Sequence, residues 1–468
     1  MAHLAVAPES PRTAAAAPTS PWLVFSIASI AVFLVSLDVT VLYAAFPALR
    51  AGFPAASPGD LSWVLNAYTV MYAALLVPAG RFADLRGRKR AFLGGLAVFL
   101  AASLGCGLAP SVGVLVVART VQAIGAALLL PASLSLVLAA FPADRRAIAV
   151  SLWGAVSGLA AAVGPSLGSL LVDHGGWPFA FFLNLPFGLI ALVRGARSLE
   201  ESKNAANGAP IDIPGVVLLV AGVGAIALGL VRSESLAWSS PAVAGSLVAG
   251  LAMLAAFVGW ARRATAPAID LTLFRDRTYR WINAATLVYG IAFAMMFFSI
   301  FQFATGVWHY SLSRAGLAAS PGPLLVVPTA LVCGRIAVRR GHRNMLIAGS
   351  LVFAAGCAWM AIGLQATPAY ATGWLPGMIL TGLGVGMVMP SLSAAAVAHL
   401  APNRFGVGSA VNQAVRQIGA VLGVALAVAL AGRAGATVAA FQHLFWWQAA
   451  LAVGVALLCL PVDTRPRA

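Results

Sequence analysis

Three charged side chains stand inside long apolar segments of the sequence: Asp38, Arg119 and Arg416. A charge in the hydrocarbon of a membrane is costly, so such residues usually face a cavity or a partner. Burial favours the protonated form of a carboxylate, whereas a nearby arginine favours the ionised form. A carboxylate balanced between these effects can bind a proton from one side and release it to the other. We therefore expect Asp38 to carry a coupling proton that Arg119 modulates; the alternative is a static ion pair between helices.

The other acidic residues fall in loops, tails or segment ends, and the second half of the chain has no acid inside an apolar segment. A cavity with one acid and two arginines suits dications poorly, because desolvated positive charge would lack partners. Neutral, monocationic or weakly acidic amphiphiles fit such a cavity better. The side chains expected to line it are Tyr43, Gln122, Asn184, Gln302, Asn412 and Arg416. Buried amides also pair helices through hydrogen bonds, which is the alternative role for these amides.

The composition indicates which elements position these residues. Of the 468 residues, 61% are hydrophobic and 9% are charged, whereas soluble domains carry about 25% charged residues. A helix needs about 20 apolar residues to cross the hydrocarbon core. The sequence therefore predicts an all-α membrane protein with fourteen transmembrane spans. The predicted spans are 22–48, 61–80, 91–109, 113–137, 147–172, 179–194, 213–231, 241–260, 281–304, 315–334, 344–364, 374–398, 407–432 and 444–461.

The net charge of +16 comes from basic residues in short loops between the spans. No basic helix or aromatic-interleaved patch is present, so nucleic acid is not an expected partner. Lys and Arg concentrate in alternate loops, which predicts that those loops and both termini are cytoplasmic. Residues 1–21 are predicted to form a disordered cytoplasmic tail. The four cysteines lie singly in apolar segments without metal-ligand spacing, so no metal site is predicted.

An internal repeat divides the chain. Gly80–Lys89 reads GRFADLRGRK and Gly334–Arg343 reads GRIAVRRGHR, with five of ten positions identical at an offset of 254. Gly164–Gly168 (GPSLG) corresponds to Gly419–Gly423 (GAVLG) at an offset of 255. Parallel repeats of this kind place a substrate cavity between the halves, near the membrane midplane. The repeat predicts six-helix bundles at 22–194 and 281–461, two extra helices at 213–260, cytoplasmic loops at 195–212 and 261–280, and a tail at 462–468.

Several motifs are similar to those of one transporter family. Gly80–Lys89 resembles the first cytoplasmic-loop signature of the major facilitator superfamily. Leu115–Ala127 resembles its motif with an intramembrane Arg, and Gly164–Ser169 resembles its antiporter motif. Leu37–Pro47 and Phe181–Gly188 resemble signatures of its fourteen-helix drug:proton antiporter branch. The likeness runs from about Leu37 to Leu430. The chain departs from the family pattern at Tyr43, Ala123, Pro178 and Val338.

The resemblance implies a proton-coupled antiporter that exports small amphiphilic organic compounds such as drugs or secondary metabolites. It implies a multi-pass protein of the cell membrane that uses the proton gradient, needs no cofactor and acts as a monomer on a small-molecule substrate. A gating loop is expected at Gly80, Asp84, Gly87, Arg88 and Lys89, with Asp84 as a latch; the alternative is a loop that only sets topology. An antiporter helix is expected at Gly164, Pro165 and Gly168, where the glycines allow close packing and the proline a kink.

Other function classes are less consistent with the sequence. GPSLG matches the G-x-S-x-G pattern of hydrolases, but that motif requires a strand-to-helix turn, whereas this one lies inside an apolar span. No enzymatic activity is therefore expected. An importer or facilitator of the same fold for a metabolite or lipid is the main alternative. A non-transporting membrane sensor is a third reading, and it would require a soluble signalling domain.

Overall fold

The computed structural model describes residues 20–142, 145–202, 212–233, 235–400, 404–434 and 437–464, and every regular element in these residues is helical. Thirteen helices in this part of the chain are long and apolar enough to cross a membrane. The helix at the fifth predicted span, Arg146–Gly175, is not one of these thirteen, but it is 30 residues long. Each of the fourteen predicted spans thus coincides with one helix or with two consecutive helices. The predicted tail lies outside the described residues up to residue 19, as does the stretch 203–211 of the predicted loop 195–212.

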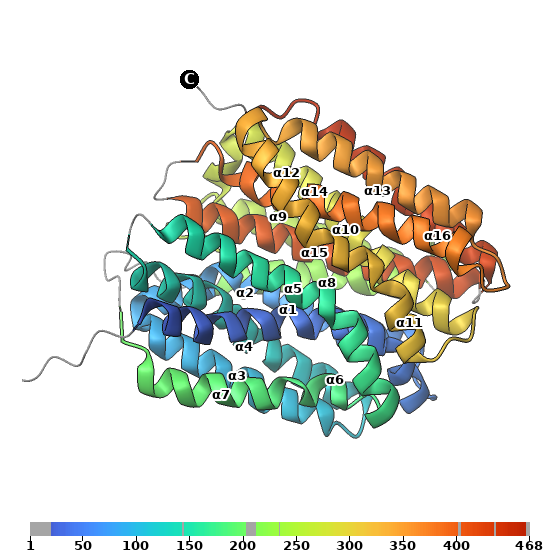
Figure 1. Cartoon of the computed structure of the whole chain (residues 1–468), viewed down its shortest axis with the longest axis horizontal. Coiled ribbons are helices and arrows are strands. Elements are labelled where there is room, and N and C mark those ends of the chain that lie inside the picture. The colour runs from blue at the N-terminus through green and yellow to red at the C-terminus, as the bar shows by residue number, and fades with distance from the viewer. Residues whose placement is uncertain are drawn as a thin grey trace, which may run out of the picture.

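The first half comprises α1 (Pro21–Gly52), α2 (Pro58–Arg86), α3 (Arg88–Gly107), α4 (Val112–Ala140), α5 (Arg146–Gly175), α6 (Phe179–Phe182) and α7 (Asn184–Ser198). The two extra helices are α8 (Ile213–Arg232) and α9 (Pro241–Ala261). A short turn, η3 (Leu271–Arg275), precedes the second half, which comprises α10 (Arg277–Gly306), α11 (Leu312–Ala319), α12 (Pro321–Arg340), α13 (Arg343–Gly363), η4 (Tyr370–Trp374), α14 (Leu375–Val397), α15 (Phe405–Ala434) and α16 (Val438–Leu458). In Figure 1, α1–α4 and α7 fill the lower part of the view, and α12–α14 and α16 the upper part.

Two predicted spans are interrupted in the structure. The span predicted at 179–194 consists of α6 and α7, which meet at Leu183. The span predicted at 315–334 consists of α11 and α12, which meet at Ser320 just before Pro321; proline lacks the backbone N–H that would continue the helical bonds. Many helices also extend beyond the predicted bounds, because polar residues cap them. At the start of α2, for example, the Ser57 hydroxyl accepts a hydrogen bond from the backbone N–H of Asp60. The Asp60 carboxylate in turn accepts one from the backbone N–H of Ser57.

Helix packing repeats in the two halves. In the first half α1 packs on α5, α3 on α4 and α2 on α4. The corresponding helices of the second half pack in the same way: α10 on α15, α13 on α14 and α12 on α14. Between the halves, α2 packs against α15, which is the counterpart of α5. In the same way, α5 packs against α11 and α12, which together are the counterpart of α2. The matching glycines Gly87 and Gly341 both have positive φ, at 116° and 85°, so the repeat read from the sequence is also a structural repeat.

Glycines bring paired helices into backbone contact. A Cβ atom on Gly125 of α4 would lie 2.6 Å from the carbonyl oxygen of Gly95 and 2.6 Å from the backbone nitrogen of Phe99 on α3. On α15, Cβ atoms at Gly419 and Gly423 would collide with the carbonyl oxygens of Leu287 and Ile291 on α10. Small residues drive helix association in membranes because they allow this close approach.

The α8–α9 hairpin lies across the contact between the halves. α8 packs against α2 of the first half and α15 of the second. Asp212, which caps α8, accepts hydrogen bonds from Trp260 Nε1 at 2.7 Å and from the backbone nitrogen of Ala268 at 2.8 Å. The segment that follows α9 therefore folds back onto the start of the hairpin.

The segment between α9 and α10, residues 262–276, contacts both halves. The Ala266 carbonyl accepts a hydrogen bond from Arg81 Nη1 of α2 at 2.8 Å, and Asp270 forms an ion pair with Arg404, beside the start of α15, at 2.5 Å. Burial raises the pKa of Asp270, but hydrogen bonds from Thr272 and Arg404 outweigh it and lower the pKa below its usual range. Asp270 is therefore negatively charged at neutral pH, and the ion pair is in place.

Gly125→Val is expected to destabilise the packing of α4 on α3 by at least about 1–3 kcal/mol, because the added side chain meets rigid backbone. The matched control is Gly113→Val in the same helix, where a Cβ atom meets nothing within 4 Å. The unfolding midpoint and the monodisperse fraction of detergent-solubilised protein measure the effect. Equal behaviour of the two variants would contradict the packing argument.

Candidate functional site

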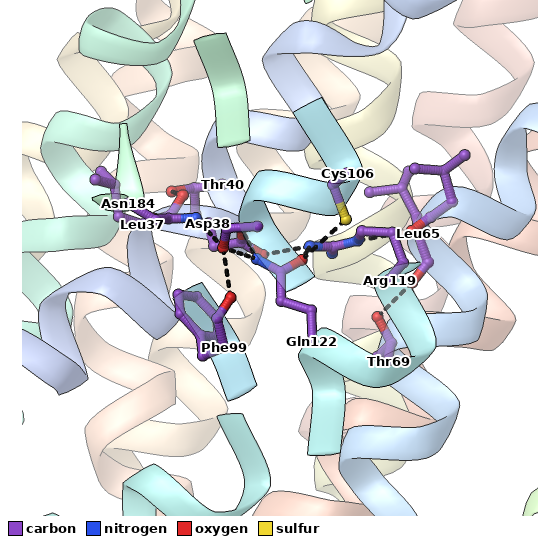
Figure 2. Close-up of polar contacts among 12 residues, drawn as sticks. Leu37, Asp38, Thr40, Leu65, Thr69, Phe99, Cys106, Arg119, Gln122 and Asn184 are labelled. Atoms are coloured by element: carbon purple, nitrogen blue, oxygen red, sulfur yellow. Dashed lines mark hydrogen bonds and ion pairs between the residues drawn. The ribbon is translucent and has the colours of Figure 1, made fainter. Parts of the chain in front are cut away.

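A buried ion pair lies within the first half of the protein. Arg119 Nη1 on α4 donates a hydrogen bond to Asp38 Oδ2 on α1 at 2.6 Å. Asp38 is 2% exposed and Arg119 is 1% exposed, so neither charge has access to bulk water. Figure 2 shows the two side chains pointing toward each other between their helices. The structure thus joins the two charges that the sequence singled out.

The second carboxylate oxygen of Asp38 also has partners. Asp38 Oδ1 accepts hydrogen bonds from Gln122 Nε2 at 2.9 Å and from Asn184 Nδ2, at the start of α7, at 3.0 Å. Gln122 follows Arg119 by three residues and so lies on the same face of α4; its Oε1 accepts a bond from Arg119 Nη1 at 2.6 Å. Asp38 accepts from all three donors, as an ionised carboxylate does, because it has no proton to donate.

Ser103 on α3 holds the two amides in place. Its hydroxyl accepts from Gln122 Nε2 at 2.8 Å and from Asn184 Nδ2 at 3.3 Å, and donates to the Phe99 carbonyl at 2.8 Å. Sequence reasoning missed Ser103, because a lone serine in an apolar span is ordinary in membrane helices. The signal available was its place in the middle of the span predicted at 91–109.

Arg119 has further contacts that fix its position. Its Nε donates to the Val64 carbonyl of α2 at 3.1 Å. The guanidinium carbon lies 4.0 Å from the centre of the Tyr68 ring and 5.7 Å from that of Phe181, distances at which a ring face attracts a cation. The ion pair thus connects α1, α2, α3, α4 and α7 through polar contacts.

The remaining residues predicted for the cavity lie elsewhere. Tyr43 is buried on α1, with its ring centre 5.7 Å from that of Phe297 on α10, so it lies at the contact between the halves. Asn412 donates to Asn283 Oδ1 at 3.1 Å and to Thr286 at 3.0 Å; these bonds join α15 to α10, which is the helix-pairing alternative. Gln302 is partly buried on α10. Arg416 is partly buried on α15 and separate from the ion pair.

The predicted antiporter helix contacts both halves. A Cβ atom on Gly168 would lie 2.7 Å from Val41 Cγ1 of α1, and one on Gly164 would collide with Thr40. On the other side, the Ser166 and Ser320 hydroxyls are hydrogen-bonded. A Cβ atom on Gly316 of α11 would lie 2.8 Å from the Pro165 carbonyl. α5 is therefore held between α1 and the second half by small residues.

The predicted gating loop has a local ion pair. Asp84 Oδ1 accepts from Arg88 Nε at 3.0 Å, so its partner is an arginine of the same loop. The backbone nitrogens of Lys89 and Arg90, at the start of α3, donate to the Glu201 carboxylate at 3.1 and 3.3 Å. Gly87 has a φ of 116° and Gly80 packs on Pro131 of α4. The side chain of Val338, at the corresponding position of the second half, lies outside the described part.

Comparisons with known proteins are consistent with this architecture. The family model described as Major Facilitator Superfamily matches residues 28–424 and 282–468. The multidrug resistance protein Stp of Mycobacterium tuberculosis is 32% identical over 383 residues, which cover 82% of this chain and 70% of that protein. The cephamycin export protein CmcT of Amycolatopsis lactamdurans is 34% identical over 391 residues, which cover 82% of this chain and 80% of that protein.

A solved structure has the same fold. It is that of a bacterial homologue of the human drug peptide transporters PepT1 and PepT2, and the match covers 95% of this chain and 98% of that chain. The TM-score is 0.66 and the sequence identity is 16%.

Arg119→Ala is expected to destabilise the protein by about 3–5 kcal/mol, because Asp38 would remain buried without its cationic partner. Arg119→Lys keeps the charge and should lose less. The double variant Asp38→Asn with Arg119→Gln leaves no buried charge and should regain part of the stability lost by Arg119→Ala. Unfolding midpoints in one detergent measure all four proteins. An unchanged midpoint in Arg119→Ala would mean that the ion pair does not hold the helices together.

Proposed function

The chain belongs to the Major Facilitator Superfamily, and we propose that it exports small amphiphilic organic compounds from the cell in exchange for protons. Membership of this family makes it a membrane transporter of small molecules and not an enzyme. The names of relatives support the outward direction, because they describe drug resistance and antibiotic export. The observation that carries the proton-coupling part is the buried Asp38–Arg119 ion pair with its amide donors.

Protonation of Asp38 would change the balance of this cluster. A neutral carboxyl no longer attracts Arg119, and its added proton conflicts with one of the three donors that now point at it. The arrangement seen here would then lose its main electrostatic contact, and a conformation with Asp38 apart from Arg119 would be favoured. A proton can thus shift the population of two states by binding one of them more tightly.

α1 provides a route from this cluster to the contact between the halves. Asp38 lies on the same helix as Tyr43 and Phe46, whose rings contact Phe297 and Phe298 of α10 at 5.7 and 4.8 Å between centres. A shift of α1 caused by loss of the ion pair would therefore change its contact with the second half. α5 packs on α1 through Gly164 and Gly168, and it would be affected by the same shift.

The contact of α5 with α11 and α12 is suited to opening. It includes small residues and hydroxyl groups, such as Gly316, Ser166 and Ser320. Such surfaces can separate with little loss of buried apolar area. Alternating access requires separation at one side of the membrane while the other side stays closed.

Asp38→Asn is expected to abolish proton-driven export, because Asn keeps the size and hydrogen bonding of Asp but does not titrate. Growth of an expressing strain across a panel of organic antimicrobials identifies the exported compounds. The Asn variant should reduce tolerance to that of cells without the protein, at equal amounts in the membrane. Asp60→Asn, the same change at an exposed position, is the control.

Vesicles with an imposed pH gradient then test direction and coupling for any compound found. A second measurement uses the solubilised protein. Addition of an exported compound should release protons from the parent and should release none from Asp38→Asn. If the Asn variant still releases protons like the parent, Asp38 is not the coupling site. Flux into the cell along with protons would instead support an importer of the same fold.

Asp84→Asn is expected to slow turnover by up to about fivefold with little change in apparent substrate affinity. Its ion pair with Arg88 lies at the end of α2, where a partly exposed pair contributes about 1 kcal/mol or less. If the pair forms in one state only, its loss shifts the balance between states. Spin-label distances across this end of the protein report that balance. Unchanged distances together with normal turnover would leave the loop with a role in topology only.

A further inference from the structure

Arg416 is a partly buried arginine of α15 whose charge has no counter-ion among the described residues. Its Nη2 donates to Gln413 Oε1 at 2.6 Å and its Nη1 lies 3.0 Å from the sulfur of Met389 on α14. Both partners are neutral. Among the described residues no ion pair links Arg416 to a carboxylate, and Asp38, the acid inside the first half, is already paired with Arg119. Within the described part of the spans, the charge of Arg416 is therefore not balanced by an acid.

An uncompensated cation inside a membrane protein is expensive. Other intramembrane charges are normally paired, as Arg119 is here, or they mark the path of a substrate. Arg416 also differs from Arg119 in exposure, because its side chain is partly accessible whereas Arg119 is fully buried. An accessible, unpaired guanidinium is able to accept a partner from outside the chain.

A second polar group near Arg416 also lacks a partner. α10 passes close to Arg416 at Tyr289, since a Cβ atom on the next residue, Gly290, would lie 2.6 Å from the Arg416 carbonyl oxygen. Tyr289 is 0% exposed, and its hydroxyl has no hydrogen-bond partner in the described part of the chain. Buried hydroxyls are nearly always hydrogen-bonded. An unpartnered hydroxyl donor on α10 and a guanidinium without a counter-ion on the adjacent α15 offer two kinds of contact that an anionic group requires.

The apolar surroundings are aromatic on both sides. Tyr289 stacks along Phe293 on α10, with ring centres 6.5 Å apart, and Tyr72 stacks on Tyr68 on α2 at 5.9 Å. Since α2 packs against α15, Arg416 lies where rings from both halves meet. Planar apolar bodies pack well against such rings.

We propose that Arg416 binds the acidic group of the transported compound, and that the substrates are organic acids with a planar aromatic body. This inference rests on the proposed transport function and specifies its substrate class. A guanidinium binds carboxylates and related anions through paired, charge-assisted hydrogen bonds. Tyr289 donates a further bond from its hydroxyl. The competing explanation is that Arg416 only packs α15 on α14 through its contact with Met389, while Gln413 of α15 holds the guanidinium in place.

The test uses the full chain in lipid nanodiscs, with empty nanodiscs as the background. The probes are three matched pairs of an acid and its primary amide: benzoate, naphthalene-2-carboxylate and anthracene-2-carboxylate with the corresponding carboxamides. Binding is measured by equilibrium dialysis at neutral pH, without a proton gradient. The parent should bind at least one acid about tenfold or more tightly than its amide, the range expected of a charge-assisted hydrogen bond.

Substitutions of Arg416 separate recognition from packing. Arg416→Gln should lose the preference for acid over amide, while Arg416→Lys keeps part of it. Arg50→Gln, at the exposed end of α1, should retain it in full. All variants must elute as monodisperse protein. If Arg416→Gln does not, the acid-over-amide preference of Arg416→Lys is compared with that of the parent, and an unchanged preference would overturn the proposal. Equal binding of acid and amide by the parent, a preference that survives in Arg416→Gln, or no bound acid at all would each overturn the proposal.

The outcome is distinguishable from failure of the proposed function. Binding of acids without any proton-driven flux would overturn proton-coupled export and leave the role of Arg416 intact. Proton-driven export that treats acids and amides alike would overturn the role of Arg416 and leave the proposed function intact.

Discussion

A carboxylate and a guanidinium without access to water must satisfy each other, and in this protein that requirement determines which helices of the first half are joined. Asp38 and Arg119 would each be very costly alone in hydrocarbon. Together they use donors and acceptors from α1, α2, α3, α4 and α7, including the Val64 carbonyl and the Ser103 hydroxyl. The cluster therefore joins five helices through buried polar contacts, and it is the contact at which we propose that a single proton acts.

The rest of the bundle is assembled with little polar specificity. Glycines place α4 against α3 and α15 against α10 at backbone distance, which yields many weak contacts and few directional ones. The two halves meet through α2 with α15 and through α5 with α11 and α12. The rocking motion that alternating access requires would keep the packing within each half and change only this boundary.

Much of the fold could be predicted because apolar segments of membrane-spanning length are unambiguous in a sequence with so few charges. The break at Leu183 could not, since it lies within an apolar window and depends on local backbone geometry; the break at Ser320 did have a signal in Pro321, which the span prediction did not use. Asp38 and Arg119 were predictable because charges in such segments are rare. Ser103 and the Val64 carbonyl were not, since a serine or a backbone carbonyl carries no signal until the neighbouring helices are placed.

The α8–α9 hairpin makes the protein asymmetric toward the lipid. α8 lies over the boundary between α2 and α15, and the following segment contacts Arg81 of one half and Arg404 of the other. The equivalent boundary between α5 and α12 has no such cover from the hairpin in the described residues. A compound dissolved in the bilayer therefore meets two different flanks. On one flank the two additional helices would stand between it and the interior, and on the α5 flank it would meet the boundary between the halves without them.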